Sequence, residues 1–125
     1  MEPIKTFVYF NLHKKCFSIK ALEGVNKGRV IAHRDALVLY HAKFKVSEAG
    51  RQRVLKEQRK NVHAGVVGIW YDEVDADKTL RVRDTVAVTY NPYKYDSFVT
   101  VADKQRIDEA WCVVLKDKKI TAVSF

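Results

Sequence analysis

The chain has 125 residues, 47% of them apolar, and its 23 basic and 15 acidic side chains give a formal charge of +8. Its length and apolar content predict one domain, residues 1–125, with a core large enough to need no disulfide or metal. No window reaches the apolar length of a membrane span, so we expect no membrane partner. The surplus of basic side chains favours a phosphate-rich partner such as nucleic acid, although such a surplus can also serve solubility alone.

Cysteine and histidine spacing gives no support for a metal centre or a cofactor. The two cysteines, Cys16 and Cys112, form no CxxC motif. No two of the four histidines are four residues apart, so we expect neither a metal nor a cofactor. The amino-terminal segment carries Glu2 and only a short, broken apolar run, unlike a secretory signal. These features predict a soluble cytoplasmic protein with free thiols.

Three strands are predicted before residue 34. The aromatic run FVYF at residues 7–10 and the clean alternation at residues 16–21 each favour a strand, and the short polar stretch between them favours a hairpin. Gly24 and Gly28 mark the next reversal, because glycine suits tight turns. A third strand follows at residues 29–33.

A long strand and a helix come next. Residues 36–46 alternate over their whole length, which predicts a strand with Tyr40, Ala42 and Phe44 on one face. Ser47 is a good helix cap, and the residues from 49 to 60 are good helix formers apart from one glycine.

The rest of the chain predicts further strands separated by polar turns. Strands are expected at residues 62–71, 80–90 and 98–101, with an acidic turn after the first and a proline-containing loop before the last. A terminal hairpin is expected from residues 110–115 and 120–125. Together these elements predict an α+β fold, with a mostly antiparallel β-sheet or a small curved barrel and one basic helix.

Positive charge is concentrated in residues 43–68. This segment holds seven basic and two acidic side chains, a net charge of +5, and ends with His63 between small residues. Such density predicts a surface that attracts a polyanion. The residues expected to bind it are Lys14, Arg51, Arg53, Lys56, Arg59, Lys60 and Asn61.

A second candidate binding segment is the loop YNPYKY at residues 90–95. Exposed tyrosines next to a lysine can stack on bases while the ammonium group meets a phosphate. We therefore add Tyr93, Lys94 and Tyr95 to the expected binding residues. The alternative is a rigid turn whose tyrosines pack back onto the sheet.

Histidines give the sequence an enzymatic alternative. His33 and His63 could act as acid and base in metal-independent cleavage of a phosphodiester, with Lys14 or Arg59 on the phosphate and Tyr93 nearby. This requires the histidines to converge on one pocket. The alternative is that they are surface or capping residues.

Several strings resemble small uncharacterised proteins encoded by tailed bacteriophages. These strings, spread over residues 7–100, are FNLHKKCFSIKALEG, KGRVIAHRD, FKVSEAGRQRV, RKNVHAGVVG and TYNPYKYDSFV. The resemblance implies a phage product that acts in the host cytoplasm, and it transfers no catalytic residue.

Three functions follow as hypotheses. The first is an accessory protein that binds nucleic acid, a nucleotide or an acidic host protein through its basic surface. The second is a small metal-independent nuclease or nucleotide-modifying enzyme. The third is an inhibitor directed at a host enzyme.

Overall fold

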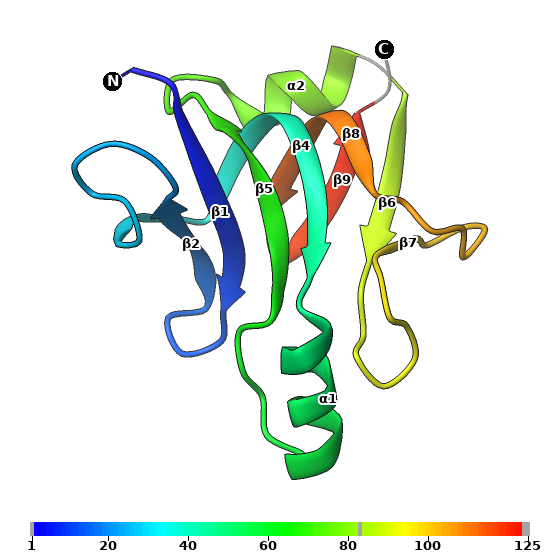
Figure 1. Cartoon of the computed structure of the whole chain (residues 1–125). Helices are drawn as coiled ribbons and strands as arrows, with labels where there is room; N and C mark the ends of the chain where they lie inside the picture. The colour runs from blue at the N-terminus through cyan, green and yellow to red at the C-terminus, as the bar shows by residue number, and fades with distance from the viewer. Residues whose placement is uncertain (1, 83, 124–125) are drawn as a thin grey trace.

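One nine-stranded antiparallel sheet is the framework of the protein (Figure 1). The computed structural model describes residues 2–82 and 84–123. Its elements in chain order are β1 (Ile4–Asn11), β2 (Cys16–Ala21), β3 (Val30–Arg34), β4 (Ala36–Val46), α1 (Glu48–Glu57), β5 (Ala64–Trp70), α2 (Ala76–Val82), β6 (Thr85–Thr89), β7 (Val99–Thr100), β8 (Glu109–Lys116) and β9 (Lys119–Val123).

The strands are arranged in the order β3-β2-β1-β5-β4-β8-β9-β6-β7. Every pairing among these strands is antiparallel, which confirms the predicted sheet type. The sheet is strongly curved, but β3 and β7 remain its two outer edges, so of the two predicted alternatives the open sheet is correct and the barrel is wrong. The β1–β2 and β8–β9 hairpins form as expected, although residues 124–125 of the predicted last strand lie outside the described residues. In the second, Asp117 and Lys118 both have positive φ, of 52° and 68°, as a two-residue hairpin turn requires.

An irregularity in β4 reverses the faces predicted for this strand. Its register against β5 shifts between Tyr40 and Lys43, and the intervening His41 has a φ of 51°. The extra residue puts Leu39 and Ala42 on the same face, although simple alternation separates them. Alternation read from sequence therefore assigned the first half of the strand to the wrong side.

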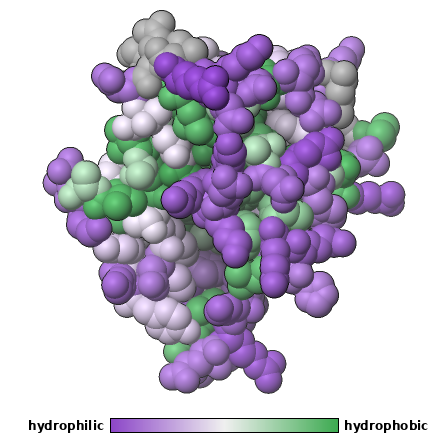
Figure 2. Space-filling model, turned by 180° about the vertical axis from the view of Figure 1, so that it is seen from behind, coloured by the Kyte–Doolittle hydropathy of each residue, from purple (hydrophilic) through white to green (hydrophobic). Residues whose placement is uncertain are grey.

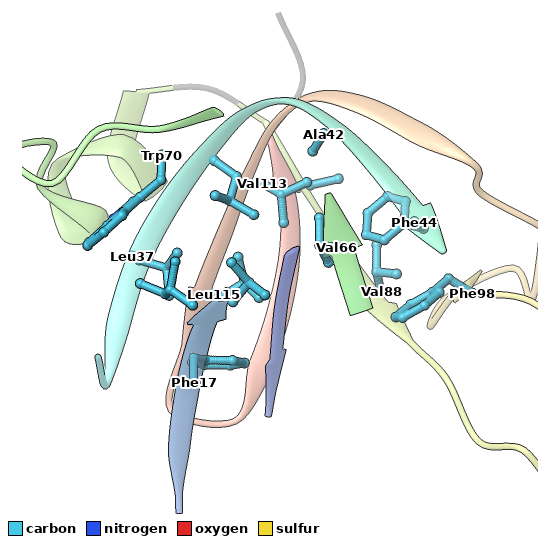
Figure 3. Close-up of a cluster of buried hydrophobic side chains, with 14 residues drawn as sticks. Phe17, Leu37, Ala42, Phe44, Val66, Trp70, Val88, Phe98, Val113 and Leu115 are labelled. Atoms are coloured by element: carbon cyan, nitrogen blue, oxygen red, sulfur yellow. The ribbon is translucent and has the colours of Figure 1, made fainter. Parts of the chain in front are cut away.

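The core fills the concave side of the sheet, beneath the arch of β4 (Figure 3). Phe17, Leu39, Trp70 and Leu115 come from four different strands and are at most 2% exposed. Figure 2 shows that hydrophilic side chains cover most of the far side of the molecule, with hydrophobic ones in separate patches.

A second, smaller core lies under α2. Val38, Cys112 and Val114 are buried on the outer side of the sheet and pack with Ala76 of this helix. The sequence predicted a strand from residue 80, but residues 80–82 belong to α2. Asp75 explains the helix, because its side chain accepts the backbone N–H of Lys78 as a capping residue does.

Helix α1 forms where the sequence predicted a helix, and it is shorter than expected. Ser47 caps it by accepting the N–H of Gly50, and Gln58 ends it in the left-handed conformation. The helix itself holds three basic and two acidic residues, a net charge of +1, because Arg59 and Lys60 lie beyond its end. In the described part of the chain, neither helix has the length and apolarity needed to cross a membrane.

Gly65 should be intolerant of any side chain. A Cβ at this position would lie 2.5 Å from the carbonyl oxygen of Val8 and 2.7 Å from the ring of Phe7. We expect Gly65→Ala to lower the free energy of unfolding by about 1–3 kcal/mol, because overpacking forces the strands to shift. Urea denaturation measures this, with Ala87→Ser on exposed β6 as a control; equal midpoints for the two variants would contradict the packing described.

Candidate functional site

Four chain segments that lie at the lower end of the sheet in Figure 1 contribute side chains to one pocket. They are the β1–β2 turn, the stretch between α1 and β5, the loop at residues 90–97 and the β8–β9 turn. We call the loop the tyrosine loop and the pocket the mouth pocket. Its volume of about 710 Å³ lies within the range of small-ligand sites.

The floor of the mouth pocket is the apolar core itself. Phe17, Val66, Phe98 and Leu115 all line it and all belong to the main core. A ligand that enters would therefore meet an apolar surface at the bottom. The pocket suits a ligand with a flat or apolar part.

Positive charge borders the pocket. Lys60 and Lys118 line it, and none of the described lining residues is acidic. The ammonium of Lys118 lies 5.9 Å from the centre of the Phe10 ring, a cation–π contact that holds it at the edge. The pocket therefore favours a ligand that also carries negative charge.

His63 is held in one orientation by hydrogen bonds at both ring nitrogens. Nδ1 lies 3.1 Å from the carbonyl oxygen of Asn61, and Nε2 lies 2.6 Å from the hydroxyl of Tyr90. A carbonyl only accepts, so the bond to Asn61 assigns the proton to Nδ1, and Nε2 then accepts from Tyr90. In this arrangement the basic nitrogen of His63 is already occupied.

Helix α1 fixes the backbone of His63 as well. The N–H of Ser47 donates to the carbonyl of His63 at 2.7 Å. A Cβ on Gly50 would lie 2.6 Å from the Cβ of His63, so the helix reaches this residue only because position 50 has no side chain. Gly50 lowers the intrinsic stability of the helix, but it allows the helix to pack closely against His63.

Tyr90 connects the site to the core. Its ring stacks on Phe98 with centroids 5.1 Å apart, and Phe98 contacts Phe44 in turn. Burial raises the pKa of the Tyr90 hydroxyl to about 12, although the charge of Arg51 opposes this shift. The hydroxyl is therefore protonated at neutral pH and available as the donor to His63.

Arg51 joins α1 to the tyrosine loop. Its Nε donates to the carbonyl oxygens of Pro92 and Tyr95, at 3.1 and 3.0 Å, and its Nη1 donates to Glu48 at 3.0 Å. The side chain is only 17% exposed. Arg51 therefore acts within the fold, whereas the sequence placed it among the ligand-binding cations.

The tyrosine loop is an ordered turn with one exposed ring. Asn91 accepts the N–H of Tyr93 on its side chain, and its carbonyl accepts the N–H groups of Lys94 and Tyr95. Tyr93 lines the mouth pocket and is 60% exposed, while Tyr95 is half-buried. The sequence left two alternatives, a rigid turn and exposed tyrosines. The loop is a rigid turn, and Tyr93 is its exposed tyrosine.

The other predicted binding residues lie around the pocket or apart from it. Lys60 and Asn61 line it, in company with His63. Exposed residues that do not line it are Lys14, Arg53, Lys56, Arg59 and Lys94.

His33 is not brought to His63. It lies on edge strand β3, two strands beyond β1, and its Nδ1 is 2.9 Å from the hydroxyl of Ser18. The convergence of two histidines that the enzymatic hypothesis required does not occur. Among the described residues, no group of three or more histidine, cysteine or acidic side chains is placed to hold a metal ion.

Lys118 is the site residue that the sequence did not indicate, because it belongs to the predicted terminal hairpin turn. Tyr90 belongs to the candidate segment at residues 90–95, but the sequence did not predict its bond to His63. The order of the strands brings them to the pocket. A lysine next to an aspartate in the predicted turn at residues 116–119 was the one available signal.

Comparison with known proteins identifies the family. Residues 1–123 match the model of the family described as the Mycobacterium phage L5 gene 82 protein. The chain belongs to this family. The gene 82 protein of Mycobacterium phage L5 is 40% identical to it over 129 residues, with 97% of each chain covered. No solved structure matches the chain significantly.

The phage resemblance stated from sequence is therefore confirmed. The matched range is wider than the quoted strings, because it includes the carboxy-terminal hairpin that contributes Lys118. The family assignment gives a phage gene product and assigns no role to any residue.

Loss of the Arg51 side chain should destabilise the protein more than loss of its neighbour on the same helix. Arg51→Ala removes charge-assisted bonds to two loop carbonyls, so we expect the free energy of unfolding to fall by about 1.5–3 kcal/mol. Arg53→Ala removes an exposed side chain and should change it by less than about 0.5 kcal/mol. Urea denaturation compares the two, and equal losses would contradict the proposed anchoring.

Tyr90 should ionise well above an ordinary tyrosine. An unfolded chain ionises this side chain near pH 10, whereas the folded protein keeps it protonated up to about pH 12. The stability that Tyr90 contributes is therefore complete below pH 10 and is lost as the pH rises toward 12. Ultraviolet titration of tyrosinate, as the difference between the native protein and Tyr90→Phe, should show one transition near pH 12. A transition near pH 10 would contradict the buried hydroxyl.

Proposed function

We propose that this phage gene product binds a nucleotide in the mouth pocket, within the cytoplasm of the infected host. The observation that carries the proposal is the joint presence of an apolar floor, two lysines and an exposed tyrosine around one cavity of about 710 Å³. A nucleotide offers a flat ring for the floor and a phosphate for the lysines.

The phosphate would lie between Lys60 and Lys118. These lysines come from different segments and border the same pocket, and no acidic side chain lines it among the described residues. Within the described chain neither lysine forms an ion pair with an acidic side chain. Their charge is therefore available to an anion.

The base would be recognised by Tyr93 and Asn61. The exposed ring of Tyr93 at the rim can stack on a base, and stacking of this kind is tolerant of base identity. The side-chain amide of Asn61 has no hydrogen-bond partner in the described structure, so it can pair with a base edge.

Three exposed cations on and just after helix α1 enter the proposal as a source of electrostatic attraction. Arg53 and Lys56 on α1, with Arg59 just beyond it, are exposed and do not line the pocket. They would raise the local concentration of an anionic ligand without contacting it. Such an effect weakens with salt, since the Debye length is about 8 Å at physiological ionic strength.

Isothermal titration with nucleoside monophosphates tests the proposal. We expect binding of at least one of them, and about a tenfold loss in the double variant Lys60→Gln/Lys118→Gln, because two charge-assisted contacts disappear. Tyr93→Ala should weaken binding about fivefold or more through lost stacking, and Tyr93→Phe should not. The matched control is Lys27→Gln/Lys78→Gln, two exposed lysines away from the pocket.

Absence of binding to any nucleoside monophosphate at low salt would overturn this proposal. So would an equal loss in the pocket variant and the control. If the corresponding nucleosides bound as tightly as the nucleoside monophosphates, the proposed contact between the lysines and the phosphate would be wrong.

The enzymatic alternative has less support. His63 has its basic nitrogen bonded to Tyr90, and a second histidine does not reach the pocket. Incubation of the protein with labelled RNA and DNA in EDTA tests for cleavage, and products that vanish in His63→Ala would favour the enzyme. A single host protein co-purifying without nucleotide affinity would favour the inhibitor.

A further inference from the structure

The outer face of the sheet carries a second arrangement of aromatic and basic side chains. Phe7 and Tyr9 lie on β1, and their rings are 6.0 Å apart at an angle of 31°. Both alternate with Val8, which points into the core, so both belong to the opposite face. We call this surface the outer platform, made of Lys5, Phe7, Tyr9, Lys20, Lys43, Lys45 and Val67.

The strand register places these residues in rows across the sheet. Lys20 of β2 pairs with Phe7, Phe7 pairs with Val67 of β5, and Val67 pairs with Lys43 of β4. Because side chains on paired residues share a face, a lysine stands on each side of the central ring. The two lysines are three strand spacings apart, about 14 Å at about 4.8 Å per spacing.

Glycine at position 65 lets the Phe7 ring lie low on the sheet. Gly65 pairs with Lys45, and a Cβ on it would lie 2.8 Å or less from two atoms of the Phe7 ring. The ring therefore rests against the strand backbone and remains partly exposed. A planar group could stack on it from outside.

No helix covers this part of the sheet. Helix α2 packs over the first half of β4 and over β8, through Val38 and Val114. Figure 1 shows β1, β5 and the second half of β4 side by side with neither helix in front of them. The outer platform is therefore open along its length.

The charge of the platform is positive. Lys5, Lys43 and Lys45 are exposed and Lys20 is half-buried, and in the described structure none of the four forms an ion pair. The nearest acidic residue in these rows is Glu109, which pairs with Lys43. Glu23 also lies beside the platform, where its carboxylate accepts the backbone N–H of Lys5. Four lysines against these two carboxylates still leave a surface complementary to a polyanion.

We propose that the outer platform binds single-stranded nucleic acid. Bases would stack on Phe7 and Tyr9, and the flanking lysines would neutralise phosphates on either side, a division of roles that suits unpaired strands. A duplex keeps the faces of its bases stacked inside, so they are not available to Phe7 and Tyr9. The platform goes beyond the nucleotide pocket and meets it only at Tyr9, which lines both.

Fluorescence anisotropy with a short labelled single strand tests the platform. For Lys43→Gln/Lys45→Gln, we expect the slope of log affinity against log salt to shrink by about 0.7 for each lysine that contacts a phosphate. Phe7→Leu should weaken binding about fivefold or more, because it removes a stacking surface while it keeps an apolar side chain. The double variant Lys27→Gln/Lys78→Gln is the control, and thermal unfolding of each variant confirms the fold.

Three results would overturn the proposal: no strand binding at low salt, an unchanged salt slope in the Lys43→Gln/Lys45→Gln variant, or a duplex bound as tightly as the single strand. Failure here is separable from failure of the pocket. Lys60→Gln/Lys118→Gln should weaken nucleotide binding about tenfold and leave the platform slope unchanged. The platform variants should lower the salt slope of single-strand binding and leave nucleotide affinity unchanged.

Discussion

The guanidinium of Arg51 is the contact on which the mouth pocket depends. From helix α1 it donates to the carbonyls of Pro92 and Tyr95 in the tyrosine loop. These residues are 41 and 44 positions further along the chain. The same helix holds His63 through Ser47 and through the absence of a side chain at Gly50. One short helix therefore positions both the histidine and the aromatic rim. Its own hydrophobic contact is small, with Val54 its one buried residue.

Curvature of the sheet supplies the rest of the pocket. The extra residue at His41 bends β4 so that Leu39 and Ala42 both face the concave side. That side fills with apolar side chains, and its lower end remains open between Phe98 and Leu115. The pocket is thus the unfilled end of the core, and the polar side chains at its edge come from the turns that surround it.

Local features of the fold could be predicted from the sequence, and long-range ones could not. Alternation located β2 and β4, and Ser47 marked the start of α1, because these signals depend on neighbouring residues. The position of the bulge at His41 and the helix at residues 76–82 depended on packing that only the folded sheet supplies. Part of the candidate site could be predicted from the sequence, namely Lys60, Asn61, His63 and Tyr93. Lys118 could not, because the order of the strands in the folded sheet determines its position. Arg51 was assigned to a ligand because its carbonyl partners were unknown.

The central claim is that four distant segments form one ligand site at the mouth of the sheet. Backbone amide chemical-shift mapping during titration with a nucleoside monophosphate tests it most directly. The account predicts that the largest shifts occur together in all four segments, at Leu12, His63, Tyr93 and Lys118, with smaller ones on β7 and α2. Shifts confined to one of these segments, or spread over α2 and the edge strand β3, would contradict it.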